Sequence, residues 1–143
     1  MKNNKSILKE RIGKDGKRKS PRLPLDIKNF LIDIDGVISE DVPNEEPERM
    51  LLAKEIPGAK KQINQWYKEG NIITFFTSRT KNLEKTTEKW LKKRGFKYHG
   101  LICGKPRGGN YHYIDDATKI RATRFEGKFG KLVYKNKKIQ VFE

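Results

Sequence analysis

Two carboxylates stand at the end of a short apolar segment. The run at 30–32 is followed by Asp33 and Asp35, and Gly36 comes next. An apolar run of this length that stops at a turn residue predicts a buried strand. Two negative charges so close together favour a nearby cation, and Mg²⁺ prefers carboxylate and carbonyl oxygens. The alternative interpretation is an ordinary solvated Asp-x-Asp-Gly turn, which this segment alone leaves open.

Further polar residues accompany the other apolar segments. Thr77 follows the segment at 72–76, Lys105 lies just ahead of the segment at 111–114, and Asp115 and Asp116 end that segment. In parallel sheets the working groups gather beyond the carboxyl ends of the strands, so we expect these side chains to converge at one edge. Taken singly, Thr77 would be a helix-terminal hydroxyl and Lys105 a solvated loop lysine.

The elements that must position these residues alternate in type. Strands are expected at about 28–34 and 72–76, a weak one at 98–102, and another at 111–114. Helices are expected between them: Pro57 suits a first helical position, and Gly70 and Gly95 suit left-handed ends. This alternation predicts an α/β fold with a parallel central sheet and helices on its faces. Further strands are expected at 120–125, 131–135 and 138–142, which would make the C-terminal end strand-rich.

Composition bounds the class of protein. The 143 residues fit one domain, contain no apolar run of transmembrane length and begin without an apolar signal core. The single cysteine, Cys103, excludes an internal disulfide. These features predict a cytoplasmic protein without membrane contact. The sequence leaves the oligomeric state undetermined.

The net charge of +15 is concentrated at the two ends. Residues 1–24 carry nine Lys and Arg against two acids, and residues 117–143 carry eight against two. We expect 1–24 to be an irregular or mobile basic arm and 25–143 to be the folded domain. Such ends could attract a nucleic acid or an anionic substrate. Alternatively, they are a solvating tail and a lysine-rich sheet edge.

The ordered set of motifs resembles the haloacid dehalogenase (HAD) superfamily. The set consists of Asp-Ile-Asp-Gly-Val from Asp33, the strand that ends at Thr77, Lys105-Pro106, and Asp115-Asp116. The resemblance covers residues 29–116. It implies a three-layer Rossmann-like fold and a Mg²⁺-dependent phosphatase that works through an aspartyl-phosphate. An intact second aspartate fits the phosphatase pattern better than a dehalogenase.

The resemblance implies a role for each matched residue. Asp33 would be the nucleophile and a Mg²⁺ ligand. Asp35 would act as general acid and then general base, and its backbone carbonyl would reach the metal. Thr77 would offer its hydroxyl and backbone N–H to a phosphoryl oxygen, and Lys105 would supply a fixed positive charge. The metal site would be completed by Asp115 and Asp116, and the sequence does not decide which of the two binds directly.

The lengths of the segments between the motifs bear on which substrates can reach the site. Neither gap around Thr77 has room for a separate cap domain, so the site is expected to be open. Ser78, Arg79 and Arg107 are candidates for substrate binding, with an ion pair to an acid such as Glu40 as the alternative role of Arg79. The leading hypothesis is a phosphomonoesterase acting on a small phosphorylated metabolite, either a sugar phosphate or a nucleotide. The alternatives are a 3′-phosphatase that processes nucleic-acid ends and a HAD-fold binding module without catalysis.

Overall fold

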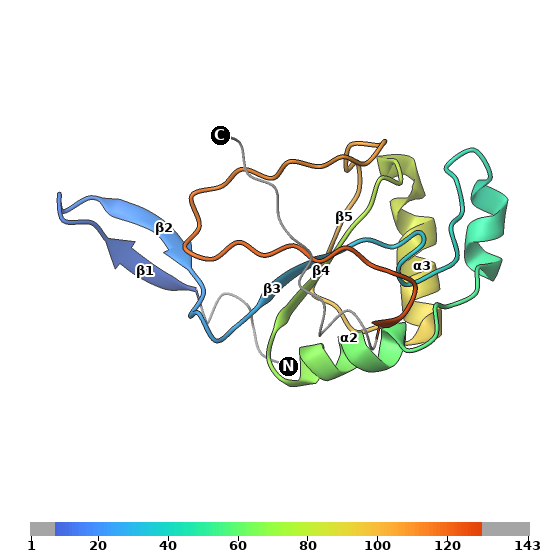
Figure 1. The fold of residues 1–143 in the computed structure, drawn as a ribbon, viewed down its shortest axis with the longest axis horizontal. Helices are drawn as coiled ribbons and strands as arrows, with labels where there is room; N and C mark the ends of the chain where they lie inside the picture. The colour runs from blue at the N-terminus through green and yellow to red at the C-terminus, as the bar shows by residue number, and fades with distance from the viewer. Residues whose placement is uncertain (1–7, 130–143) are drawn as a thin grey trace.

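Three parallel strands form the centre of the protein. The structure is a computed structural model that describes residues 8–129. The sheet has the order β3-β4-β5 (Figure 1), with β3 at Asn29–Ile32, β4 at Ile72–Phe76 and β5 at Gly100–Ile102. Both pairings are parallel. The strands expected at 28–34, 72–76 and 98–102 are therefore confirmed; β4 has the predicted bounds, and β3 and β5 are shorter than predicted.

Helices provide the connections that parallel strands require. The β3–β4 connection contains a 3₁₀ helix, η1 (Pro47–Leu52), and α2 (Ala59–Lys68), whereas the β4–β5 connection contains η2 (Lys81–Leu83) and α3 (Glu84–Arg94). The expected helices are confirmed, although α2 begins two residues after Pro57. Gly70 and Gly95 have φ angles of 96° and 80°, the left-handed conformation that glycine adopts without steric penalty.

Both helices pack against the same face of the sheet. In the strand register Phe30 lies beside Ile73, and alternation places Phe75 on the same face. Trp66 of α2 stacks on Phe30 with ring centroids 4.3 Å apart, while Phe75 contacts Phe96, just after α3, at 6.0 Å. The buried core is therefore one cluster between the sheet and these two helices.

The opposite face of the sheet is largely open. Leu31 and Ile102, which alternation places on this face, are 53% and 48% exposed. Within residues 8–129 the core thus has two layers, helices and sheet. The mixed α/β class is confirmed, whereas the third layer of the expected Rossmann-like arrangement is not found in this part of the chain.

The part of the N-terminal arm that the structure describes is not irregular, which corrects the expectation for residues 9–22. The strands β1 (Lys9–Ile12) and β2 (Arg18–Arg22) pair as an antiparallel hairpin that projects from the rest of the protein (Figure 1). Its turn is closed by a hydrogen bond from the Gly13 amide to the Lys17 carbonyl, and the Lys17 amide donates to Asp15 Oδ1. Asp15-Gly16 is a sequence signal for a β-hairpin turn, and it predicts the turn that the structure shows here.

Residues 103–128 form no strand, so the strands expected at 111–114 and 120–125 are wrong. A parallel strand needs a crossover of a dozen or more residues after the preceding strand, and the eight residues at 103–110 are too few. The segment instead runs out toward the base of the hairpin and returns toward the N-terminal end of α2 (Figure 1). It ends at Phe129, which is buried against Phe125 and lies beside Gly58. The strands expected at 131–135 and 138–142 lie outside the described residues.

The part of the chain from 8 to 129 contains no helix long and apolar enough to cross a membrane.

Candidate active site

The carboxyl edge of the sheet brings four of the predicted residues together. Asp33 and Asp35 follow β3, and Thr77 follows β4. Lys105 comes three residues after β5, and its amide donates to the Thr77 carbonyl at 2.9 Å. This pairing is helped by Gly104, whose φ of 84° suits glycine and whose amide donates to the Arg79 carbonyl. The predicted convergence at this edge is confirmed for these residues.

Asp33 and Lys105 form the centre of the site. Lys105 Nζ lies 3.2 Å from Asp33 Oδ1, and the same oxygen accepts a hydrogen bond from the Ile34 amide. The lysine side chain is only 11% exposed, and its ammonium lies 5.7 Å from the ring centroid of Phe76 and 5.3 Å from that of Tyr111. Asp33 is more open, with 38% of its side chain exposed. An anion that approaches Asp33 would therefore meet a positive charge held in place.

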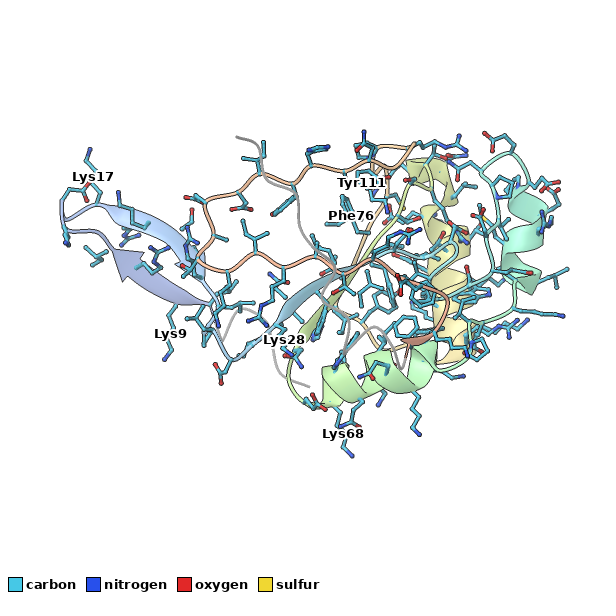
Figure 2. All side chains as sticks on the ribbon, viewed as in Figure 1. Lys9, Lys17, Lys28, Lys68, Phe76 and Tyr111 are labelled. Atoms are coloured by element: carbon cyan, nitrogen blue, oxygen red, sulfur yellow. The ribbon has the colours of Figure 1, made fainter. Side chains whose placement is uncertain are left out.

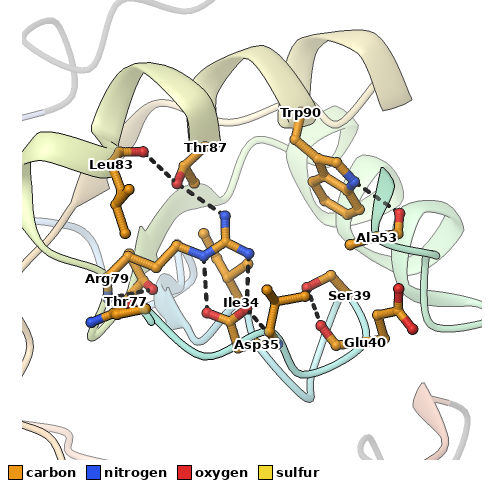
Figure 3. Close-up of polar contacts among 12 residues, drawn as sticks. Ile34, Asp35, Ser39, Glu40, Ala53, Thr77, Arg79, Leu83, Thr87 and Trp90 are labelled. Atoms are coloured by element: carbon orange, nitrogen blue, oxygen red, sulfur yellow. Dashed lines mark hydrogen bonds and ion pairs between the residues drawn. The ribbon is translucent and has the colours of Figure 1, made fainter. Parts of the chain in front are cut away.

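Asp35 is held by Arg79 rather than being free (Figure 3). Arg79 Nε and Nη2 donate to the two carboxylate oxygens at 3.0 and 2.8 Å, and the Val42 amide donates to Asp35 Oδ1 at 3.3 Å. The guanidinium also donates through Nη1 to Thr87 Oγ1, which itself donates to the Leu83 carbonyl. The side chains of Arg79 and Asp35 are 1% and 17% exposed. This is a buried, bidentate ion pair fixed from both sides.

The structure separates the alternatives that the sequence left for these residues. Arg79 forms the ion pair with an acid that was its alternative role, although the acid is Asp35 rather than Glu40, and its buried guanidinium is not free to bind a second anionic group. Thr77 cannot offer its backbone N–H in this arrangement, because that group donates to the Ile102 carbonyl at 2.9 Å. The Thr77 hydroxyl is fully buried and accepts a hydrogen bond from the Arg79 amide. Thr77 therefore fixes the turn that carries Arg79.

Ser78 and Arg107 belong to the loops around the site. Ser78 Oγ donates to the Pro106 carbonyl at 3.3 Å, which joins the loop after β4 to the loop after β5. Arg107 makes two contacts with Glu45, at 2.9 and 3.3 Å, and its hydrogen bond lowers the pKa of Glu45 below the usual value. Both groups are exposed, so this pair links the acidic loop at 40–48 to the Lys105 loop without burying charge.

Asp115 and Asp116 are not brought to the site. Asp116 contacts Arg22 at the base of the hairpin at 3.3 Å, and its side chain is 92% exposed. Asp115 accepts a hydrogen bond from the Tyr113 hydroxyl at 2.5 Å, which lowers the pKa of the carboxyl and raises that of the phenol. Among residues 8–129 no three His, Cys, Asp or Glu side chains are gathered as a metal site. Of the expected metal ligands, only Asp33 and Asp35 share one location.

Sequence reasoning missed Thr87, the residue that holds Arg79 from the helix side. A signal for it existed. Thr87 lies four residues after Leu83 and precedes Trp90 and Leu91 by three and four, so it occupies the buried stripe of α3. A hydroxyl on a buried stripe needs a hydrogen-bonding partner, and an arginine at the preceding turn is a suitable one.

Comparisons of the chain with protein-family models, with curated proteins and with solved structures gave no match.

Proposed function

We propose that this protein is a Mg²⁺-dependent phosphomonoesterase that acts through an aspartyl-phosphate on a small phosphorylated metabolite, a sugar phosphate or a nucleotide. The observation that supports this most strongly is the 3.2 Å contact of Lys105 Nζ with Asp33 Oδ1 at the carboxyl edge of a parallel sheet. It combines an accessible carboxylate with a confined cation. Those are the two groups that attack on a phosphoryl group needs, one as nucleophile and one to stabilise the added charge.

The reaction proposed for this pair has two displacements. A carboxylate oxygen of Asp33 attacks phosphorus, and the bond from phosphorus to the substrate oxygen breaks, which leaves an acyl phosphate on Asp33. Water then attacks the same phosphorus and releases inorganic phosphate and the free carboxylate. In both steps Lys105 stays beside the phosphoryl oxygens, where it offsets their negative charge.

Asp35 is the proposed proton-transfer group, and Arg79 constrains how it acts. As positioned, both of its oxygens accept hydrogen bonds from Arg79. Taking a proton from water and donating one to the leaving oxygen each place a proton on this carboxyl, so both steps require one of these contacts to open. We therefore assign Arg79 as a positioning residue for Asp35, in place of the substrate-binding role expected from sequence.

The residues that meet at the site fit Mg²⁺ chemically. Mg²⁺ keeps several waters and is commonly bound by one or two carboxylates together with substrate phosphate, so Asp33 and the backbone carbonyl of Asp35 would be sufficient protein ligands. The ion would supply positive charge to the phosphoryl group. This proposal does not use Asp115 and Asp116 as Mg²⁺ ligands, because Asp116 forms an ion pair with Arg22 at the base of the hairpin.

Access to the site admits a small phosphorylated metabolite and also a larger phosphate ester. The segment between β3 and β4 holds only a loop, η1 and α2, and the segment between β4 and β5 holds only η2 and α3. Both segments are fully described, and neither contains an additional domain that would close over Asp33. A second candidate, a 3′-phosphatase acting on nucleic-acid ends, is favoured by the basic hairpin at 9–22.

The test is hydrolysis of an aryl phosphate with Mg²⁺, with EDTA, and with an Asp33→Asn variant. We expect turnover only when both the metal and Asp33 are present. The matched control is Asp41→Asn, which removes a carboxylate from the exposed loop near the site and should leave turnover unchanged. Activity that survives in Asp33→Asn would exclude the aspartyl-phosphate mechanism. Turnover of a 3′-phosphorylated oligonucleotide in preference to sugar phosphates and nucleotides would favour the second candidate.

A further inference from the structure

The hairpin formed by β1 and β2 is a second charged feature, separate from the candidate active site. Residues 9–22 contain seven Lys or Arg and two acids. Four positions of β1 and four of β2 are exposed, with only the last position of β2 partly buried. Figure 2 shows the side chains of this hairpin, Lys9 and Lys17 among them, pointing into solvent away from the sheet and helices. The hairpin therefore has no hydrophobic core of its own that would stabilise it.

Four of the seven cations, Lys9, Arg11, Lys19 and Arg22, lie on one side of the ribbon. Lys9 and Arg11 are two positions apart on β1 and so point to the same face. The register pairs Lys9 with Arg22 and Arg11 with Lys19, so a cation lies opposite a cation twice. The register shifts by one residue between these two pairs, which accounts for the three-residue spacing of Lys19 and Arg22 on β2. Like charges directly across a strand pair destabilise it. An isolated two-stranded hairpin is marginally stable even without such repulsion.

The acidic residues of the hairpin compensate for this only in part. Glu10 pairs with Arg18 at 2.8 Å, and the Ile12–Arg18 pairing places Arg18 on the other face. On the cationic face, Lys19 contacts Asp15 at 3.5 Å and Arg22 contacts Asp116 at 3.3 Å. Within residues 8–129 no carboxylate forms an ion pair with Lys9 or Arg11.

We propose that this face, made of Lys9, Arg11, Lys19 and Arg22, binds the phosphate backbone of double-stranded DNA. The major groove of B-form DNA admits a two-stranded β-ribbon, whereas that of A-form RNA is too narrow for side chains to read. Proteins that bind single strands use aromatic platforms, and residues 9–22 contain no aromatic side chain. Cations two residues apart recur about every 6.7 Å along a strand, roughly the rise of two nucleotides.

The binding is a property of the hairpin and does not depend on the proposed phosphatase activity. The test uses the full chain and a fluorescent 20-base-pair duplex. The duplex has no terminal phosphates, so it offers no phosphate monoester to the candidate active site. Affinity is measured between 50 and 200 mM salt. Four phosphate contacts contribute about −3.6 to the slope of log K against log salt, which is a loss of about 150-fold over that range.

The deciding variant is Lys9→Gln/Arg11→Gln. It should reduce the magnitude of the slope by about 1.8, because two phosphate contacts are lost. The control, Lys85→Gln/Lys89→Gln, removes the same charge from exposed positions of α3 and should leave the slope unchanged. A charge-preserving swap, Lys9→Arg/Arg11→Lys, should bind like the wild type. This swap separates loss of charge from any change in the hairpin's fold.

Three results would overturn the proposal. The first is an equal loss of slope in the α3 control, since binding would then follow net charge alone. The second is tighter binding to single-stranded DNA, to an RNA duplex or to vesicles of anionic lipid than to the DNA duplex. The third is no duplex binding at 50 mM salt. Thermal unfolding of each variant ensures that the proteins compared are folded.

Discussion

Asp35 and Arg79, 44 residues apart in the sequence, form a two-point ion pair with the guanidinium 1% exposed. The pair joins the loop after β3 to the loop after β4. Thr87 holds the arginine from α3, so a helix on one side of the sheet sets the geometry of a carboxylate at its edge (Figure 3). Arg79 therefore contributes both to the stability of the fold and to the position of Asp35 in the proposed reaction. Substitutions of Arg79 and of Thr87 test these two contributions.

The first prediction concerns removal of Arg79. Arg79→Met should lower the free energy of unfolding by about 3–5 kcal/mol, because it leaves the Asp35 carboxylate mostly buried without its partner. Urea denaturation measures this change. Arg107→Met is the matched control, since Arg107 contacts Glu45 with similar geometry on the surface, where screening by solvent makes ion pairs weak. Equal effects of the two substitutions would contradict the structural role given to Arg79.

Thr87→Val should be destabilising by about 1.5–3 kcal/mol. The valine keeps the shape of threonine but cannot accept the hydrogen bond from the buried Arg79 guanidinium. The comparison is Thr86→Val, one position earlier in α3, where the side chain is only partly buried. If the proposed positioning role is correct, Thr87→Val also shifts the pH profile of aryl phosphate turnover, and Thr86→Val does not.

Lys105 should matter for turnover more than for stability. Lys105→Met keeps a chain of similar length between the rings of Phe76 and Tyr111 but removes the charge beside Asp33. We expect kcat to fall on the order of 10²–10³-fold, the usual effect of losing one group that stabilises charge in the transition state. Steady-state kinetics with an aryl phosphate measures it. A kcat within a few-fold of the wild type would remove Lys105 from the mechanism.

The environment of the His99 ring leads us to expect a loss of stability in mild acid. Its Nδ1 accepts a hydrogen bond from the Ile73 amide at 3.0 Å, and its ring stacks on Tyr67. Burial lowers the pKa of His99 from the ordinary 6.5. The unfolded chain therefore takes up the proton more readily, so stability is full above pH 6.5 and falls as the pH drops through 6.5 toward the lower folded pKa.

The measurement is the urea midpoint at pH 7.5 and at pH 5.5. His99→Phe keeps the stacking on Tyr67 and removes the titrating group, so its midpoint should change less between the two pH values than that of the wild type. His112→Phe should retain the full wild-type change. A His99→Phe protein with an undiminished pH dependence would show that other groups are responsible.

Local sequence signals predicted the elements of the core well. The apolar segment at 72–76, the glycines at 70 and 95 and the helical spacing in 83–91 each act over a few residues, and each element forms close to where it was expected. The convergence of Asp33, Thr77 and Lys105 was also predictable, because parallel strands bring their carboxyl ends to one edge. Pattern and chain direction were sufficient for these features.

Relationships between distant residues were decided by the tertiary structure. The sequence contains Arg79 and many acids, and only the fold selects Asp35 as its partner and Thr87 as its support. Likewise, the apolar alternation at 111–114 is typical of a strand, but the connection at 103–110 is too short for a parallel crossover. Local propensity determines what a segment is able to form. Chain length between segments, and the need to pair buried charge, determine which contacts it makes.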